Sequence, residues 1–314
     1  MKLSDFKLTA KDFGTFGRGL QRPECVWTDR DGVWASDQRG GIAHVKENSE
    51  PTILGTGIVE PNGFSRRPDG SFVVAGIGDG GLYVISPGGE TCKLLDSFGG
   101  SPLGAVNYAC ADGPGRIWLS VMTRAPRWHD ALTQQKPDGY ILRIEGGDCE
   151  IVADGLDLTN EVKVSPDGRY LYAAETLACR MVRFAIRPNG SLGNKEVVGP
   201  ETLGRAALPD GFTFDAAGNI WLTIINQNAL FVIDKHGDVH VVFRDMNEAA
   251  VGAMAAAMDR HDSTVEHLAA CTTETGPLQL PTSLAFGGAD GRTVYVGTVV
   301  SGHLPTFRLP EMLE

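Results

Sequence analysis

One pattern of apolar and polar positions recurs along the chain. An alternating stretch leads into a polar turn that ends in glycine, and a second alternating or apolar stretch follows. The clearest copy is Leu208 to Thr223, LPDGFTFDAAGNIWLT. Alternation with period two is typical of a half-buried β-strand, and a glycine turn between two such strands indicates a hairpin. The pattern occurs six times, with turn glycines at Gly32, Gly70, Gly115, Gly168, Gly218 and Gly291.

The spacing of these hairpins predicts a propeller. Four of the five gaps between turn glycines lie between 38 and 53 residues, close to the roughly 40–50 residues of a four-stranded blade. Further short apolar stretches fill the gaps, at 41–45, 81–85, 139–144, 181–186 and 229–234. We therefore predict an all-β fold in which residues 1–314 form a single six-bladed β-propeller domain of four-stranded antiparallel blades. Radial closure would remove the exposed sheet edges; a long β-sandwich is the alternative.

Two segments depart from the repeat. Residues 246–270 are rich in alanine and methionine, which favours a helical insertion. This insertion is either a lid over one face of the propeller or a surface excursion. The first 20 residues are expected to supply the outer strand of the last blade and so close the ring.

A second regularity lies at a fixed offset from the turns. The residues eight positions before the turn glycines are Glu24, Asn62, Asn107, Asn160, Asp210 and Ser283. Equivalent positions of a propeller are related by rotation about its axis, so these side chains should converge on one mouth of the channel. Buried carboxylates and carboxamides that converge would repel or remain unpaired without a cation. Oxygen ligands without His or Cys favour Ca²⁺, followed by Mg²⁺ or Mn²⁺. The alternative is that polar residues simply begin strands beside a solvated channel.

Composition narrows the partners. The formal net charge of -11 argues against nucleic acid or an anionic membrane as the partner. The six cysteines are scattered without a C-x-x-C pair, which favours reduced thiols in the cytoplasm. No apolar stretch approaches the roughly 20 residues of a membrane span, and no signal peptide is recognisable at the N-terminus. A small molecule is the expected partner, and the oligomeric state stays open.

These residues resemble the senescence marker protein / gluconolactonase / luciferin-regenerating enzyme family of metal-dependent six-bladed propellers. The marks are the Glu of PECVW, the Asn of LTNEV, the PDG of LPDGF and the late LAFGG. The resemblance implies that Glu24, Asn160 and Asp210 hold a divalent metal and that Asn107 ligates the metal or holds the substrate. The more distant diisopropyl fluorophosphatase-like propellers place a similar Glu-Asn-Asn-Asp quartet around calcium.

Three departures separate the chain from the sugar lactonases of that family. Ala105 stands where they carry an Arg that grips sugar hydroxyls, and Glu161 stands where Gly is usual. The segment 123–140 is longer and more aromatic and basic. We therefore expect a bulkier or less hydroxylated lactone or ester rather than gluconolactone.

The resemblance implies lactone hydrolysis at a divalent metal, with Ca²⁺ first and Mg²⁺, Mn²⁺ or Zn²⁺ as alternatives. Asp210 would be both a ligand and the general base or nucleophile, and Glu24 mainly a charge-neutralising ligand. Substrate contacts are expected from Asn62, Asn107, Arg124, Arg127, Trp128 and His129, the last four on a loop. Phosphotriester hydrolysis at the same site and a non-catalytic metal- or ligand-binding propeller are the alternative functions.

Overall fold

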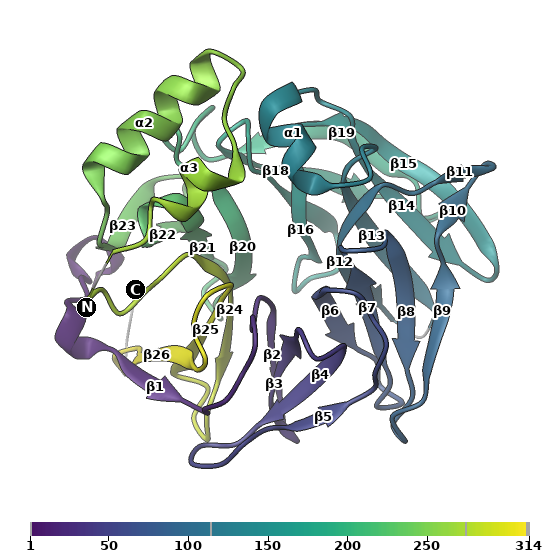
Figure 1. Ribbon diagram of the computed structural model, residues 1–314, viewed down its shortest axis with the longest axis horizontal. Helices are drawn as coiled ribbons and strands as arrows, with labels where there is room; N and C mark the ends of the chain where they lie inside the picture. Colours follow the sequence, from purple (N-terminus) through teal and green to yellow (C-terminus); the bar gives the residue numbers. More distant parts are fainter. Residues whose placement is uncertain (1, 114, 274, 312–314) are drawn as a thin grey trace.

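The computed structural model describes residues 2–113, 115–273 and 275–311. Within them, antiparallel sheets surround a common centre (Figure 1). The first sheet comprises β2 (Val26–Asp29), β3 (Gly32–Asp37), β4 (Gly41–Val45) and β5 (Thr52–Leu54). Three further four-stranded sheets follow later in the chain. They are β16 (Thr159–Val164) with β17 (Tyr170–Glu175), β18 (Arg180–Ile186) and β19 (Leu192–Val198); β20 (Pro209–Phe214) with β21 (Ile220–Ile224), β22 (Ala229–Ile233) and β23 (Val239–Arg244); and β24 (Pro281–Gly287) with β25 (Thr293–Thr298), β26 (Leu304–Arg308) and β1 (Gly14–Phe16).

The remaining large sheet has eight strands in two antiparallel halves. Its halves are β6 (Pro61–Arg66), β7 (Phe72–Gly76), β8 (Gly81–Ile85) and β9 (Thr91–Leu95), and β12 (Ala105–Asp112), β13 (Arg116–Thr123), β14 (Gly139–Glu145) and β15 (Asp148–Leu156). They meet through one parallel pair, Tyr108 with Gly63. A Cβ on Gly63 would lie 2.6 Å from the Asn107 carbonyl oxygen, so this approach of two backbones requires glycine. A short hairpin, β10 (Ser97–Phe98) and β11 (Ser101–Pro102), precedes β12.

The first strand of each unit lies nearest the centre, and these strands form a closed circuit. β2, β6, β12, β16, β20 and β24 contact one another in that order, and β24 contacts β2 again. The all-β, propeller-like fold predicted from the repeat is therefore present. The N-terminal segment supplies the outer strand of the last sheet, as predicted, because β1 pairs antiparallel with β26.

Apolar side chains fill the space between neighbouring sheets. The largest completely buried ones are aromatic and include Trp118, Trp221, Phe64 and Phe212. The indole nitrogens of Trp118 and Trp221 donate to Asp112 and Asp215, at 3.0 Å each. In both hairpins the Asp lies at the turn and the Trp in the second strand, so the polar edge of a core aromatic is satisfied locally.

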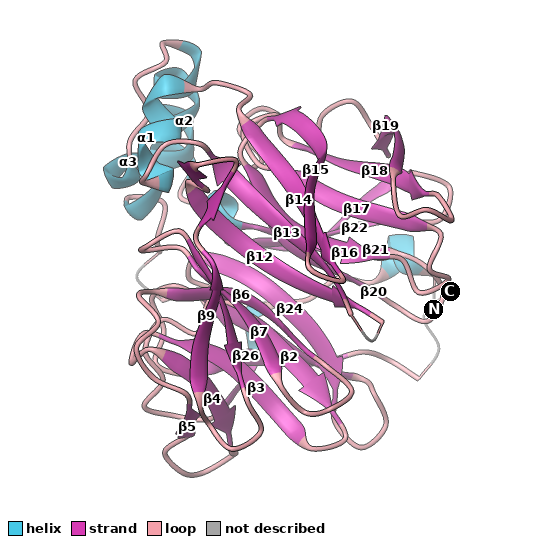
Figure 2. Cartoon of the chain, turned by 90° about the vertical axis from the view of Figure 1, so that its right-hand side faces the viewer, coloured by secondary structure: helices cyan, strands magenta, loops and turns pink. Residues whose placement is uncertain are grey.

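The three α-helices of the described residues gather on one face (Figure 2). Two of them, α2 (Glu248–Asp259) and α3 (Val265–Ala269), lie in the insertion that was predicted to be helical. The third, α1 (Trp128–Gln134), begins within the predicted loop: Arg124 and Arg127 lie in a loop as predicted, but the prediction was wrong for Trp128 and His129. Three short 3₁₀ helices complete the elements: Leu3–Asp5, Ala10–Asp12 and Ile225–Gln227.

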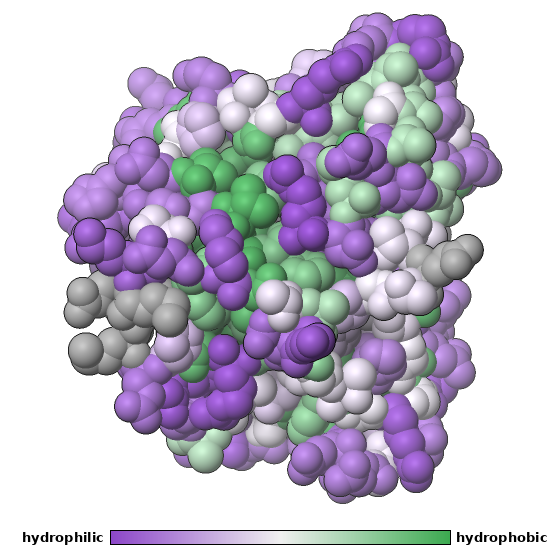
Figure 3. Space-filling view, turned by 90° about the vertical axis from the view of Figure 1, so that its left-hand side faces the viewer, coloured by the Kyte–Doolittle hydropathy of each residue, from purple (hydrophilic) through white to green (hydrophobic). Residues whose placement is uncertain are grey.

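On the left-hand side of the molecule as seen in Figure 1, hydrophobic side chains gather in the middle and hydrophilic ones surround them (Figure 3). All six cysteines are free, and Cys25 is completely buried in the apolar core. In the ranges that the structure describes, none of the helices is long and apolar enough to cross a membrane.

Candidate metal centre

Five of the six inner strands are irregular where they begin, and only β2 pairs with its neighbour without a shift. Pairing with the second strand shifts register between Pro61 and Phe64, and the shift recurs at the equivalent place in the later sheets. A bulge leaves a residue outside the ladder and re-aims its side chain. The first residue inside each bulge is, in chain order, Asn62, Asn107, Asn160, Asp210 and Thr282; Glu24 lies two residues before β2.

Four of these positions follow a residue with left-handed backbone. Arg22, Glu60, Leu158 and Leu280 have φ between 45° and 54°, and each stands two residues before its polar residue. Non-glycine residues seldom adopt this conformation, and such strain is concentrated at functional sites. The chain therefore turns sharply just before the side chain that it presents to the centre.

The oxygen-bearing residues at these positions share one cavity. Glu24, Asn62, Asn107, Asn160 and Asp210 line a space of about 300 Å³ at the centre of the ring, and each is at most 7% exposed. The structure thus brings together the five oxygen-bearing residues that the turn offset selected.

The sixth position belongs to Thr282, and the prediction of Ser283 was wrong. The β24–β25 hairpin is longer than its counterparts: Phe286 lies opposite Val294, whereas Arg66 lies opposite Phe72. Counting back from Gly291 therefore reaches Ser283, the second residue of the bulge, instead of Thr282, the first. The Ser283 hydroxyl accepts a hydrogen bond from the Val26 amide at 2.9 Å, while Thr282 lines the cavity.

Four buried oxygens of this ring lack a hydrogen-bond partner among the described residues: Glu24 Oε2, Asn107 Oδ1, Asn160 Oδ1 and Asp210 Oδ1. The amide nitrogens are engaged, because Asn107 Nδ2 donates to Met122 Sδ at 3.4 Å and Asn160 Nδ2 to Thr176 Oγ1 at 3.3 Å. Each unpaired buried acceptor costs free energy. A cation coordinated by all four oxygens would remove that cost, so this donor set fits a hard divalent ion.

The donor set is mixed in charge. Two carboxylates and two amides provide the free oxygens, and no group of three or more His, Cys, Asp or Glu side chains suited to a metal occurs in the described ranges. Softer metals prefer His and Cys ligands. Two negative charges and two neutral oxygens suit an ion that must remain electrophilic.

Burial controls the protonation of the two carboxyls. It raises the pKa of Glu24 and of Asp210, and the mutual proximity of these groups raises the Asp210 pKa further. The Arg22 guanidinium opposes both effects. Without a cation, therefore, both carboxyls keep their protons to a higher pH than they would in water.

Asn62 and Arg22 brace this ring. Arg22 donates to Asn62 Oδ1 at 2.9 Å, and Asn62 Nδ2 donates to Glu24 Oε1 at 3.2 Å. Both ends of the Asn62 amide are thus engaged. Its hydrogen bond fixes one Glu24 oxygen and leaves the other free for a ligand.

Glu161, noted in the sequence as a departure from glycine, lies next to the ring. Its Oε2 is 2.8 Å from Lys163 Nζ and accepts a hydrogen bond from the Phe212 amide at 3.0 Å. The side chain is buried. Glu161 therefore ties β16 to β20 two residues after Asp210, a role that no pattern in the sequence indicated.

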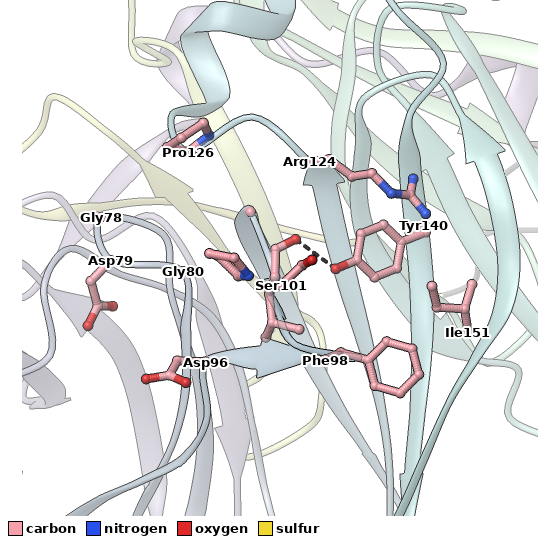
Figure 4. A pocket seen from close by; sticks show the side chains of 13 residues that line it. Gly78, Asp79, Gly80, Asp96, Phe98, Ser101, Arg124, Pro126, Tyr140 and Ile151 are labelled. Atoms are coloured by element: carbon pink, nitrogen blue, oxygen red, sulfur yellow. Dashed lines mark hydrogen bonds between the residues drawn. The ribbon is translucent and has the colours of Figure 1, made fainter.

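Of the four residues expected to form a substrate wall, the structure places two at the central cavity and two away from it. Trp128 and His129, at the start of α1, line the central cavity. Arg124 instead donates to Asp154 at 2.9 and 3.0 Å, lies 4.5 Å above the Tyr140 ring, and borders a separate cavity of about 510 Å³ (Figure 4). Arg127 pairs with Asp130 at 2.7 Å on the surface. Neither arginine reaches the central cavity.

Sequence reasoning missed most of the cavity wall. Apolar residues of α1 and α3 and of the loops before the inner strands surround the ring, among them Leu132, Leu158, Val265, Leu268 and Leu280. The composition of the insertion predicted a helix but not its position. A helix packed in the core and a helix above a cavity have similar patterns of apolar residues in the sequence.

The chain is similar to a known protein family and to several known proteins. The SMP-30/Gluconolactonase/LRE-like region matches residues 23–247. A 6-deoxy-6-sulfogluconolactonase of Pseudomonas putida is 24% identical over 282 residues, which cover 87% of this chain and 81% of that protein.

Solved structures share the fold. A gluconolactonase of Xanthomonas campestris superimposes with a TM-score of 0.65 at 18% identity and covers 98% of this chain and 89% of its own. The calcium-binding protein regucalcin of Agrobacterium tumefaciens gives 0.62 at 17% identity, with 96% and 92% covered. The family match spans most of the chain, all four residues with unpaired oxygens included. The protein belongs to the SMP-30/gluconolactonase/LRE-like family of lactonase-type hydrolases.

Proposed function

We propose that this protein is a metal-dependent lactonase whose divalent ion, Ca²⁺ in the first place, is held by Glu24, Asn107, Asn160 and Asp210. One observation carries the proposal: these four side chains present buried, unpaired oxygens to a single cavity. Membership of a lactonase family and the likeness to a calcium-binding propeller support it.

The proposed roles of the side chains follow from their charges. A divalent cation bound there would polarise the lactone carbonyl and lower the pKa of an attacking water. Glu24 neutralises part of the charge, and Asn107 and Asn160 coordinate without neutralising more. Asp210 is the proposed ligand and general base, because its buried carboxyl lines the cavity with one oxygen unpaired and a base must lie within reach of the water from which it takes a proton. Trp128 and His129 are the proposed substrate contacts of α1.

The six-bladed architecture is part of the same proposal. Dividing the eight-stranded sheet at its single parallel pair gives two antiparallel four-stranded units. With the four other four-stranded sheets they form six blades, and each blade contributes one bulge or pre-strand residue to the ring. A sixfold arrangement thus accounts for ligands that are far apart in the sequence.

The test is hydrolysis of a lactone panel by chelator-stripped protein, with and without Ca²⁺, Mg²⁺, Mn²⁺ and Zn²⁺. Activity should return with a metal, and Asp210→Asn should abolish it. Asp238→Asn is the matched control, because Asp238 is an exposed turn residue outside the cavity. Tight metal binding without turnover of lactones would assign a non-catalytic binding protein, and turnover of phosphotriesters alone would assign the phosphotriesterase alternative.

A further inference from the structure

The cavity above the ring is apolar. Trp128 and Leu132 reach it from α1, and Val265 and Leu268 from α3. The described lining holds few other polar side chains. Beyond the ring residues and the Arg22 and Thr176 side chains bonded to them, they are Glu60 and His129.

This distribution is unsuited to a sugar ring. Each hydroxyl of a sugar lactone loses its water on binding and needs a partner, since an unpaired buried polar group is costly. The upper walls offer one unpaired buried atom among the described residues, His129 Nδ1. They therefore favour a substituent made largely of carbon and hydrogen, with polar neighbours at Glu60 and His129.

One exposed apolar side chain of α3 borders the cavity. Four large hydrophobic side chains of the described ranges are mostly or substantially exposed: Val59, Leu94, Val265 and Val300, at 51, 48, 37 and 54%. Val265 lines the cavity itself, whereas Val59 lies against Gly78, which borders the separate cavity. Val265 is therefore an exposed apolar side chain at the cavity, where such side chains mark a binding site.

The helical walls are fixed in place. Ser263 Oγ, at the end of the α2–α3 connection, donates to the Leu132 carbonyl of α1 at 2.6 Å, and Thr133 Oγ1 donates back to the Ser263 carbonyl at 3.1 Å. Leu268 packs with Leu208 and Ile225 in a buried cluster. Since α1 and α3 are joined before any ligand arrives, little ordering cost accompanies binding.

We propose that the substrate is a lactone that carries an apolar chain or aryl group. This group lies between α1 and α3, and the lactone carbonyl lies beside Glu24 and Asp210. This inference rests on the proposed lactonase function. Water supplies a hydroxyl to the acyl carbon and a proton to the ring oxygen as the C–O bond breaks, so the product is a hydroxy acid with the same chain.

The first test is a series of γ-lactones with straight alkyl chains from methyl to octyl, hydrolysed by the Ca²⁺-loaded protein. We expect kcat/KM to rise about fourfold per added methylene, the value for full burial of a CH₂ group, until the cavity is filled. Gluconolactone should be the poorest substrate. Rates that ignore chain length, or a preference for gluconolactone, would overturn the inference and leave the lactonase intact.

Binding of the corresponding γ-lactams, followed by calorimetry, separates this inference from the reaction. Lactams resist ring opening, so their affinity reports the apolar wall even in a protein that hydrolyses nothing. Affinity that increases with chain length supports the wall. Affinity independent of chain length excludes it, whatever the hydrolysis experiment gives.

A pair of exposed variants supplies the control. Val265→Asp places a charge in the wall and should flatten the chain-length dependence, so that the ratio of octyl to methyl kcat/KM falls at least tenfold. Leu94→Asp changes another exposed apolar residue, on β9 and outside the lining, and should leave the ratio unchanged. Equal ratios in the two variants would contradict a substrate wall at α3.

Discussion

Thr176 shows how the ring depends on residues behind it. Its hydroxyl accepts from Asn160 Nδ2 and donates to the Pro209 carbonyl at 2.8 Å, so it links one proposed ligand to the strand that carries another. Loss of a hydrogen bond behind a ligand typically weakens metal binding by about 10–100-fold. We expect Thr176→Val to lower Ca²⁺ affinity at least tenfold in a calorimetric titration.

Thr176→Ser is the matched control, because it keeps the hydroxyl and should bind Ca²⁺ nearly as the parent protein does. If valine and serine variants bind equally well, the Asn160 amide does not need this partner, and its proposed role as a ligand weakens.

The buried carboxyls predict how stability depends on pH. Burial raises the pKa of Glu24 from 4.5 to about 7, so the metal-free native state binds more protons than the unfolded chain between these values. Its stability should therefore fall as pH rises through that window, by on the order of 1–3 kcal/mol. Bound Ca²⁺ replaces the protons and should abolish the fall.

Urea unfolding with chelator and with Ca²⁺, at about pH 5 and about pH 8, measures this difference. Stabilisation by Ca²⁺ should be larger at the higher pH. Equal stabilisation at both values would show that the two carboxyls do not exchange protons for the ion.

At the scale of elements, Asn228 fixes both ends of the helical insertion. Its Nδ2 donates to the carbonyls of Asp245 and Cys271, at 3.1 and 2.9 Å, and its Oδ1 accepts from the Leu280 amide at 2.9 Å. The residue is completely buried and has a left-handed backbone, a conformation that asparagine tolerates. One side chain therefore ties the base of the insertion to the start of β24.

We expect Asn228→Ala to destabilise the protein by about 3 kcal/mol, since it leaves buried backbone groups unpaired. Chemical denaturation measures this loss, and limited proteolysis should begin within 246–270. Asn189→Ala, at an exposed turn, should change stability by less than about 0.5 kcal/mol. Equal losses in both variants would refute the anchoring role of Asn228.

The elements also show which features sequence patterns could predict. The hairpins followed from period-two alternation and turn glycines, and the oxygen ring from one constant offset. That offset failed only at Ser283, where a longer hairpin separates turn from bulge. The helix at Trp128 was missed because its seven residues contain too few turns to show a helical period. Arg124 was misplaced because sequence does not indicate that Asp154 lies opposite it.

At the scale of the molecule, the segment before β1 joins the last two sheets. The Phe6 ring meets Trp221 of β21 edge-on with 6.2 Å between centroids, and Phe13 packs edge-on against Phe243 of β23 and Phe307 of β26. These contacts bridge two units that share no ladder hydrogen bonds. They reinforce the closure that β1 makes with β26.

We expect Phe6→Ala to cost about 3 kcal/mol of stability, as for other buried aromatic residues. Thermal unfolding of the variant should begin at a lower temperature, with Lys11→Ala as an exposed control in the same segment. An unchanged melting temperature in Phe6→Ala would mean that pairing of β1 alone closes the ring.

Closure by β1 has a consequence for the order of events during protein synthesis. The ribosome releases β1 before the strands of every other sheet, yet its partner Leu304–Arg308 follows all of them in the chain. A nascent chain that ends after β25 already contains Glu24, Asn107, Asn160 and Asp210, but its β1 has no partner and its final sheet is incomplete. Truncation near the C-terminus should therefore yield open, aggregation-prone chains even though every proposed ligand has been translated.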